Sequence, residues 1–160
     1  MDATPDPVWL DEDEQEAWLA VATLMLLLPG ALDRQLTRDA NLSLFEYMVL
    51  SGLSMAPHRQ QRMSALAHFA NGSLSRLSNV VKRFEQRGWV VREPDPADGR
   101  YTVARLTDEG WEVVVAAAPG HVDAVRRHVI SPLTTAQLRS LADTGRRIAA
   151  ALGDDEHCAD

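Results

Sequence analysis

The sequence predicts a mainly α-helical protein with a small β-hairpin, an α+β fold, and two features of the chain carry this prediction. Most segments of its 160 residues place apolar side chains at three- and four-residue spacing, which is the helical period. Residues 89–106 instead begin with the apolar run Trp89 to Val91, continue through a turn-forming stretch and return with apolar and polar side chains in alternation, as a half-exposed hairpin does. The length suits one domain with its own core.

The order of elements in the middle of the chain is its most informative feature. A short helix over about 63–70, a turn at Asn71-Gly72 and a second helix to about Gly88 precede the two-stranded hairpin. This order describes a winged helix-turn-helix, which places one helix in a DNA groove and a β-ribbon beside it. We expect a winged lobe at about 43–106, flanking helices at about 11–39 and 108–152, and a flexible tail at 153–160.

The segment before the lobe carries two helix starts. Asp11 begins the first helix with an acidic turn, which the helix dipole favours. Pro29-Gly30 then leaves open either one long kinked helix or two abutting helices. Ser43 and Glu46 have the spacing of a capping box for the next helix.

The segment after the hairpin predicts two further helices. Thr107 and the acidic residues that follow it start a helix to about residue 128, which we expect to be interrupted near Pro119-Gly120. Either Thr134 or Thr135 caps the last helix, which should end at Gly153.

The helix over 73–87, capped by Ser73 or Ser75, has one apolar and one polar face. We expect its apolar stripe to face the core; the stripe consists of Leu74, Leu77, Val81 and Phe84. Arg pairs well with guanine and Asn with adenine, while Ser and Lys reach phosphates or bases. An ordinary helix with a solvated polar face is the alternative, and the neighbouring turn and hairpin favour DNA reading. The predicted DNA-binding residues here are Ser73, Ser75, Arg76 and Asn79 for bases and the cap, and Lys82 and Arg83 for phosphates.

The tip of the hairpin reads Asp98-Gly99-Arg100. Arg100 can reach into a minor groove, where negative potential is concentrated. Asp98 can pin the loop by pairing with a nearby Arg and by accepting backbone hydrogen bonds. Both are therefore predicted DNA-site residues, although a solvated turn would have the same sequence.

The charge of the chain is unevenly distributed. The net charge is −7, yet residues 58–105 carry nine Arg and Lys against four acidic residues. Residues 1–57 carry two Arg against ten acids, and residues 106–160 five Arg against nine acids. A basic block between acidic ones suits a DNA-reading module on a scaffold that does not itself bind DNA.

The sequence also indicates where the protein works. Its single cysteine, Cys158, excludes a disulfide within the chain, and the acidic N-terminus lacks the features of a signal peptide. The longest apolar stretch, 18–28, is shorter than the roughly 20 residues that span a bilayer. We therefore expect a cytoplasmic protein without a membrane partner.

Three motifs together resemble the MarR-type (multiple antibiotic resistance regulator) transcription regulators. They are LSLFEYMVL, RMSALA and the run SLSRLSNVVKRFEQRGWVVREPDPADGRYTVARLTDEGW. The D-G-R element is similar to the wing motif of that family, and L-T-D-E-G to the start of its next helix. The resemblance covers roughly residues 12–150.

The resemblance implies a triangular homodimer whose winged modules bind a pseudo-palindromic operator in double-stranded DNA. The helices at about 11–39, 108–128 and 134–152 would interlock as the dimerisation part. Such proteins usually repress genes, and many release DNA when a small, often anionic aromatic ligand binds. Surplus apolar residues in the terminal helices independently favour a dimer, which would read successive major grooves.

Other chemistry receives less support from the sequence. A pocket for an aromatic effector could be lined by Trp18, Met25, Phe45, Met48 and Met55, although core packing is the favoured explanation for each of them taken singly. His58 and Arg59 could meet an anionic ligand at the mouth of this pocket or contact DNA phosphate. The five histidines have no metal-site spacing, and Cys158 lies on an acidic tail unsuited to redox sensing. We therefore expect no metal, no cofactor and no catalysis. A winged-helix protein-interaction adaptor without specific DNA binding remains the alternative function.

Overall fold

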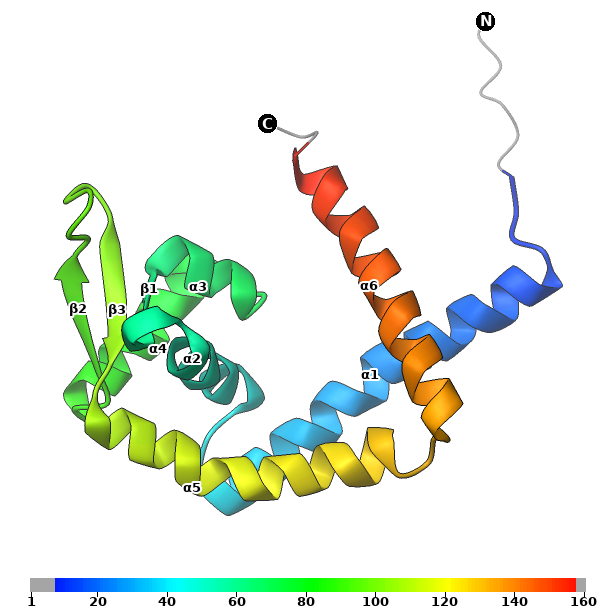
Figure 1. Ribbon diagram of the computed structural model, residues 1–160, viewed down its shortest axis with the longest axis horizontal. Helices are drawn as coiled ribbons and strands as arrows, with labels where there is room; N and C mark the ends of the chain where they lie inside the picture. The colour runs from blue at the N-terminus through cyan, green and yellow to red at the C-terminus, as the bar shows by residue number, and fades with distance from the viewer. Residues whose placement is uncertain (1–7, 158–160) are drawn as a thin grey trace, which may run out of the picture. The chain divides into compact units, whose positions relative to one another are not determined.

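The computed structural model describes residues 8–157, and the side chains of residues 8–153 (Figure 1). It divides the chain into two compact units, the first ending at Ala118 and the second beginning at Pro119. The elements that begin in the first unit are α1 (Glu12–Ala40), α2 (Leu44–Met55), the 3₁₀ turn η1 (Pro57–Arg59), β1 (Gln60–Arg62), α3 (Met63–Phe69), α4 (Leu74–Gln86), β2 (Val90–Pro94), β3 (Thr102–Leu106) and α5 (Asp108–Val125). The second unit adds the π-helical turn η2 (Arg126–Ile130) and α6 (Thr135–His157).

Helix α1 is one continuous helix that contains Pro29, so the two-helix alternative is wrong. Asp11 caps it as expected: the Asp11 carboxylate accepts the backbone N–H of Glu14 at 2.9 Å, and the Glu14 carboxylate accepts that of Asp11 at 3.0 Å. The helix ends at Asn41, whose φ of 52° is the left-handed conformation of a helix stop. Proline costs the helix one hydrogen bond, which a 29-residue helix tolerates.

Most of α1 is exposed despite its apolar composition. Its exposed large side chains are Trp18, Leu19, Leu24, Met25, Leu26 and Leu27. By length and composition alone this 29-residue helix is long and apolar enough to cross a membrane, whereas the apolar run 18–28 by itself is not. An apolar helix that packs on a protein partner has the same length and composition. The exposed apolar side chains of α1 therefore indicate a contact with either a membrane or a protein.

The core of the first unit lies where α2, α3 and α4 pack around a small sheet (Figure 1). Its largest fully buried side chains are Phe84, Leu36, Leu42, Leu50, Leu53, Leu66 and Leu77. The sheet is antiparallel with the order β1-β3-β2, so it has three strands where the sequence predicted two. Strand β1 was missed because Gln60, Gln61 and Arg62 carry no apolar alternation; they are strand residues because β3 pairs with them.

Helix α4 starts at the predicted cap, and the Ser73 hydroxyl accepts the backbone N–H of Arg76 at 3.2 Å. Leu77, Val81 and Phe84 are fully buried as predicted, and Val80 joins them. Leu74 does not: its side chain is 55% exposed, so the prediction that it faces the core is wrong. The first turn of α4 extends past the core, and helical spacing alone cannot show where a core ends.

The junction between wing and α5 is fixed by Thr107. Its hydroxyl donates to the carbonyl of Gly88 at 2.7 Å and accepts the backbone N–H of Gly110 at 3.0 Å. Its backbone N–H donates to the carbonyl of Trp89 at 3.0 Å. The end of α4, the end of β3 and the start of α5 are therefore held together at one residue.

The last two helices, α5 and α6, both differ from prediction. Helix α5 runs through Pro119 without interruption, again because the absence of one hydrogen bond does not break a long helix. Thr134 caps α6, since its hydroxyl accepts the backbone N–H of Gln137 at 3.3 Å. The helix then continues to His157 rather than ending at Gly153, because Gly153 stays within the helix instead of turning left-handed as Gly88 does with a φ of 73°. Cys158 lies outside the described residues.

Candidate nucleic-acid interface

The basic residues of the winged lobe fall into two groups. Six arginines form ion pairs: Arg59 with Asp108, Arg62 with Asp95, Arg83 with Glu46, Arg92 with Glu85, Arg100 with Asp98 and Arg105 with Glu93. Over residues 8–153, the side chains of Arg76, Lys82 and Arg87 have no carboxylate within ion-pair distance. All three lie on α4 or directly at its C-terminal end. The uncompensated positive charge of the lobe therefore lies along one helix.

Arg76 is held against the side of α2. Its guanidinium carbon lies 4.0 Å from the centroid of the Phe45 ring, a cation–π distance. The same ring closes on the turn before α4, because a Cβ at Gly72 would lie 2.4 Å from its Cε2 atom. Phe45 thus supports both the turn and the arginine of the helix that follows.

The other predicted residues of α4 are accessible to different degrees. Ser75, Asn79 and Lys82 are exposed, while the Ser73 hydroxyl is engaged in capping the helix. Arg83 donates to Glu46 at 2.7 Å across to α2, and this carboxylate also completes the capping box with Ser43. Burial raises the Glu46 pKa, but the hydrogen bonds from Arg83 and Ser43 outweigh it and leave the pKa below its ordinary value.

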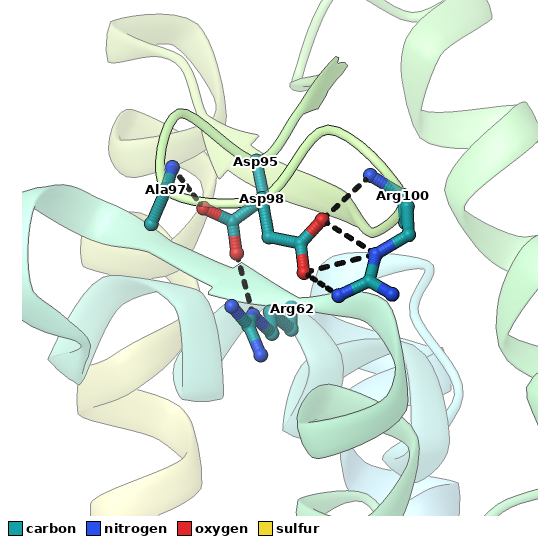
Figure 2. Close-up of polar contacts among 5 residues, drawn as sticks. All are labelled: Arg62, Asp95, Ala97, Asp98 and Arg100. Carbon is teal, nitrogen blue, oxygen red and sulfur yellow. Dashed lines mark hydrogen bonds and ion pairs between the residues drawn. The ribbon is translucent and has the colours of Figure 1, made fainter.

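The wing is pinned by two carboxylates (Figure 2). Asp98 accepts the backbone N–H of Arg100 at 3.2 Å, and Arg100 donates its Nη2 to the same carboxylate at 2.6 Å. The guanidinium of Arg100 nevertheless remains largely exposed. The predicted pairing within D-G-R is therefore present, and it holds the arginine at the hairpin tip.

The second carboxylate, Asp95, was not anticipated from the sequence. It accepts the Arg62 Nε at 2.5 Å and the backbone N–H of Ala97 at 2.8 Å (Figure 2). The guanidinium of Arg62 also lies 4.3 Å from the Tyr101 ring centroid. Because Arg62 is the N-cap of α3, this contact attaches the wing to the helix-turn-helix. The Pro-Asp-Pro sequence indicated a turn, but a partner 33 residues away leaves no local signal.

The sequence model of the MarR family matches residues 42–102. Over 127 residues the chain is 32% identical to the HTH-type transcriptional regulator PecS of Dickeya dadantii (strain 3937), covering 74% of this chain and 73% of PecS. This chain belongs to the MarR family. The crystal structure of Sco3205, a MarR family transcriptional regulator from Streptomyces coelicolor in complex with DNA, matches with a TM-score of 0.84 and 45% identity over 93% of both chains.

The relatives of this MarR-family chain are named transcriptional regulators. Transcriptional regulator HosA of Escherichia coli O111:H- is 36% identical over 74 residues, which are 46% of this chain and 53% of HosA. The chain thus spans about half the length of this curated relative. The chain therefore has the winged-helix fold of the MarR family, and the relatives that it matches here are named transcriptional regulators.

The residues suggested for an effector pocket occupy several environments in this MarR-family fold. Trp18 and Met25 are exposed on α1, whereas Phe45 is buried under α4 and Met48 is half-buried on α2. His58 is exposed in η1, where its φ of 54° is left-handed. Their role as a pocket stays a prediction. A separate hollow lies in the second unit, lined by Val122, Val125, Arg126 and Ile130.

Among the described residues, no three His, Cys, Asp or Glu side chains gather as a metal site would require. Arg59, suggested for the pocket mouth or for DNA phosphate, pairs with Asp108 at 3.0 Å and lies 4.2 Å from the Trp111 ring centroid. Its side chain therefore links η1 to the start of α5.

The wing should lose its order in acid. Hydrogen bonds from Arg100 lower the pKa of Asp98, and the N–H of Ala97 followed by Arg62 lowers the pKa of Asp95. A carboxyl with a lowered pKa stabilises the fold above its ordinary value near 4, and this stabilisation is lost as the pH falls below it. After correction for the slower intrinsic exchange in acid, we expect the amide protons of Ala97 and Arg100 to be less protected at pH 3 than at pH 5. Unchanged protection in NMR hydrogen exchange would show that the carboxylates do not hold the wing.

Proposed function

We propose that the protein is a sequence-specific, DNA-binding transcriptional repressor that acts as a homodimer in the cytoplasm. One observation carries this proposal: Arg76, Lys82 and Arg87 lie on α4 or at its C-terminal end and have no carboxylate partner within residues 8–153. The other arginines of the lobe form ion pairs. Phosphate binding needs cations that are free to exchange their counterions. The first turns of α4 add Ser75 and Asn79, which suit base edges.

The roles on α4 and the wing follow from exposure and pairing. Arg76 and Asn79 would read bases in the major groove, with Ser75 beside them, and Lys82 would bind phosphate. Arg83 would also bind phosphate while it keeps its hydrogen bond to Glu46. Arg100, oriented by Asp98, would enter the adjacent minor groove.

The homodimer is supported by the apolar surface of the terminal helices. Beyond those of α1, the exposed large apolar side chains of α5, η2 and α6 are Trp111, Val115, Val122, Ile130, Leu141, Ile148 and Leu152. A soluble monomer rarely exposes this many. A second copy of the chain that covers these side chains would also place two α4 helices on one DNA duplex. It would cover the apolar side chains of α1 as well, so that no membrane is needed to account for them.

An effector that releases the DNA belongs to the same proposal. Its chemistry would be that of a small anionic aromatic molecule, which aromatic and Met side chains and the imidazole N–H of His58 suit. Trp18, Met25, Phe45, Met48 and His58 are the residues proposed to contact it. Phe45 would then connect ligand to DNA, because its ring supports Arg76.

The proposal is tested by gel shifts of the purified protein on the DNA immediately upstream of its own gene. We expect salt-dependent binding that Arg76→Ala makes less selective, at about 1–3 kcal/mol for the preferred bases. Lys82→Ala should weaken binding to all sequences alike. A protein that ignores this DNA and random genomic fragments at physiological salt would instead be a winged-helix adaptor.

The same preparation tests the remaining parts of the proposal. Light scattering should give the mass of a dimer at the concentrations of the gel shift. A monomer mass would overturn the proposal that two α4 helices of a homodimer bind one duplex. A panel of phenolic acids added to the bound DNA should include one that releases it. Transcription from the upstream DNA in a purified system should fall when the protein is added.

A further inference from the structure

Leu74 is an apolar residue in an unexpected place. It follows the Ser73 cap as the first residue of α4, and its side chain is 55% exposed. Its helical neighbour Leu77, one turn later, is fully buried. A leucine that stays in water contributes little to folding, so its place in the fold does not explain it.

The other exposed apolar side chains of the lobe have structural partners or lie elsewhere. Phe69 packs against Gly52, where an added Cβ would lie 2.7 Å from its ring. Tyr101 is stacked on the Arg62 guanidinium. Met55 is 67% exposed as the last residue of α2. Leu74 alone of these four stands in the first turn of α4.

The surroundings of Leu74 are polar and positively charged. Ser75, Arg76 and Asn79 are exposed on the same first turns, and the start of a helix adds partial positive charge from its free N–H groups. Such a surface attracts DNA phosphate, and it brings the first turn of the helix toward the base edges. The base edges in the major groove are mostly polar. The one apolar group that they offer to a side chain such as Leu74 is the C5-methyl group of thymine.

We propose that Leu74 contacts the C5-methyl group of a thymine in the major groove and thereby contributes to operator selection. This inference rests on the proposed function, because it requires a specific DNA complex. It adds a readout that needs no hydrogen bond. A cytosine or a uracil at that position would leave the leucine side chain without its apolar partner.

The test uses the full-length protein and the duplex it selects from random-sequence DNA. Each thymine of the selected duplex is replaced in turn by deoxyuridine, which removes only the methyl group. At one thymine in each half-site we expect the affinity to fall about fourfold, as one methyl group leaves an apolar contact. The Leu74→Ala protein should bind the thymine duplex more weakly and should no longer respond to deoxyuridine at that position.

Two controls keep the result interpretable. Met55→Ala removes a comparably exposed apolar side chain from the same lobe and should keep the full response to deoxyuridine. Leu74→Met keeps an apolar chain of similar volume and should restore most of the response. Thermal unfolding of Leu74→Ala should match the native chain, because the side chain is not in the core.

The possible failures are distinguishable. If the protein selects a duplex but Leu74→Ala keeps the native response to deoxyuridine at every thymine, the Leu74 contact is wrong and the repressor proposal stands. If the protein selects no duplex at all, the proposed function fails and this inference fails with it.

Discussion

A Gly110→Ala protein is expected to unfold roughly 10 °C below the native chain. A Cβ at this position would lie 2.2 Å from the carbonyl oxygen of Trp89 and 2.7 Å from the Leu106 Cδ1 atom. The carbonyl cannot move aside, because it accepts the Thr107 backbone N–H at the junction of wing and α5. Overpacking against fixed backbone costs about 3 kcal/mol, which corresponds to that shift for a chain of this size.

The matched control for this change is Gly99→Ala at the tip of the wing. Nothing lies within 4 Å of a Cβ there, and the backbone of Gly99 is not left-handed. Its free energy of unfolding should stay within about 0.5 kcal/mol of the native value. Equal melting temperatures for Gly110→Ala and the native chain in calorimetry would mean that the junction can rearrange.

Features whose partners are close in sequence could be predicted. The Ser43 and Glu46 capping box, the Ser73 cap and the pairing of Asp98 with Arg100 all join residues two or three positions apart. Helix caps and turns form between residues only two or three positions apart. The residue types at those positions therefore suffice to predict the contact. The winged order of elements followed from the same local signals.

Features that depend on distant partners could not be predicted. Strand β1 exists through its pairing with β3, and Arg62 reaches Asp95 over 33 residues of sequence. The pairing of Arg83 with Glu46 spans 37 residues. Helical spacing predicted a buried Leu74, although it records only which side chains share a face and not how far the core extends.

The division of basic residues into paired and unpaired ones also needed the structure. From the sequence, all nine Arg and Lys of residues 58–105 were equal candidates for phosphate contact. Six of them are matched by carboxylates, of which Glu46 and Asp108 lie outside the basic block. The net charge of a segment therefore overstates the number of cations that can release counterions on binding DNA.

Replacing Arg76, Lys82 and Arg87 together by Ala should nearly abolish DNA binding. These are the cations of α4 without an ion-pair partner over residues 8–153, so the triple variant removes the charge that attracts phosphate. We expect at least a hundredfold loss of affinity at physiological salt, with a salt slope less steep by roughly 0.9 for each phosphate that the variant no longer neutralises. Fluorescence anisotropy over a salt series measures both quantities.

The control variant replaces Arg139, Arg146 and Arg147 of α6 by Ala. It changes the net charge by the same amount, and two of its arginines lie within ion-pair distance of Asp143. Long-range attraction by total charge would weaken both variants equally, whereas local contact weakens only the α4 variant. The α4 variant should keep its mass in light scattering, and its melting temperature should fall by only a few degrees, because it loses the contacts of Arg76 with Phe45 and of Arg87 with Trp89, at about 0.5–1 kcal/mol each. Equal affinity losses in the two variants would remove α4 as the DNA-binding helix.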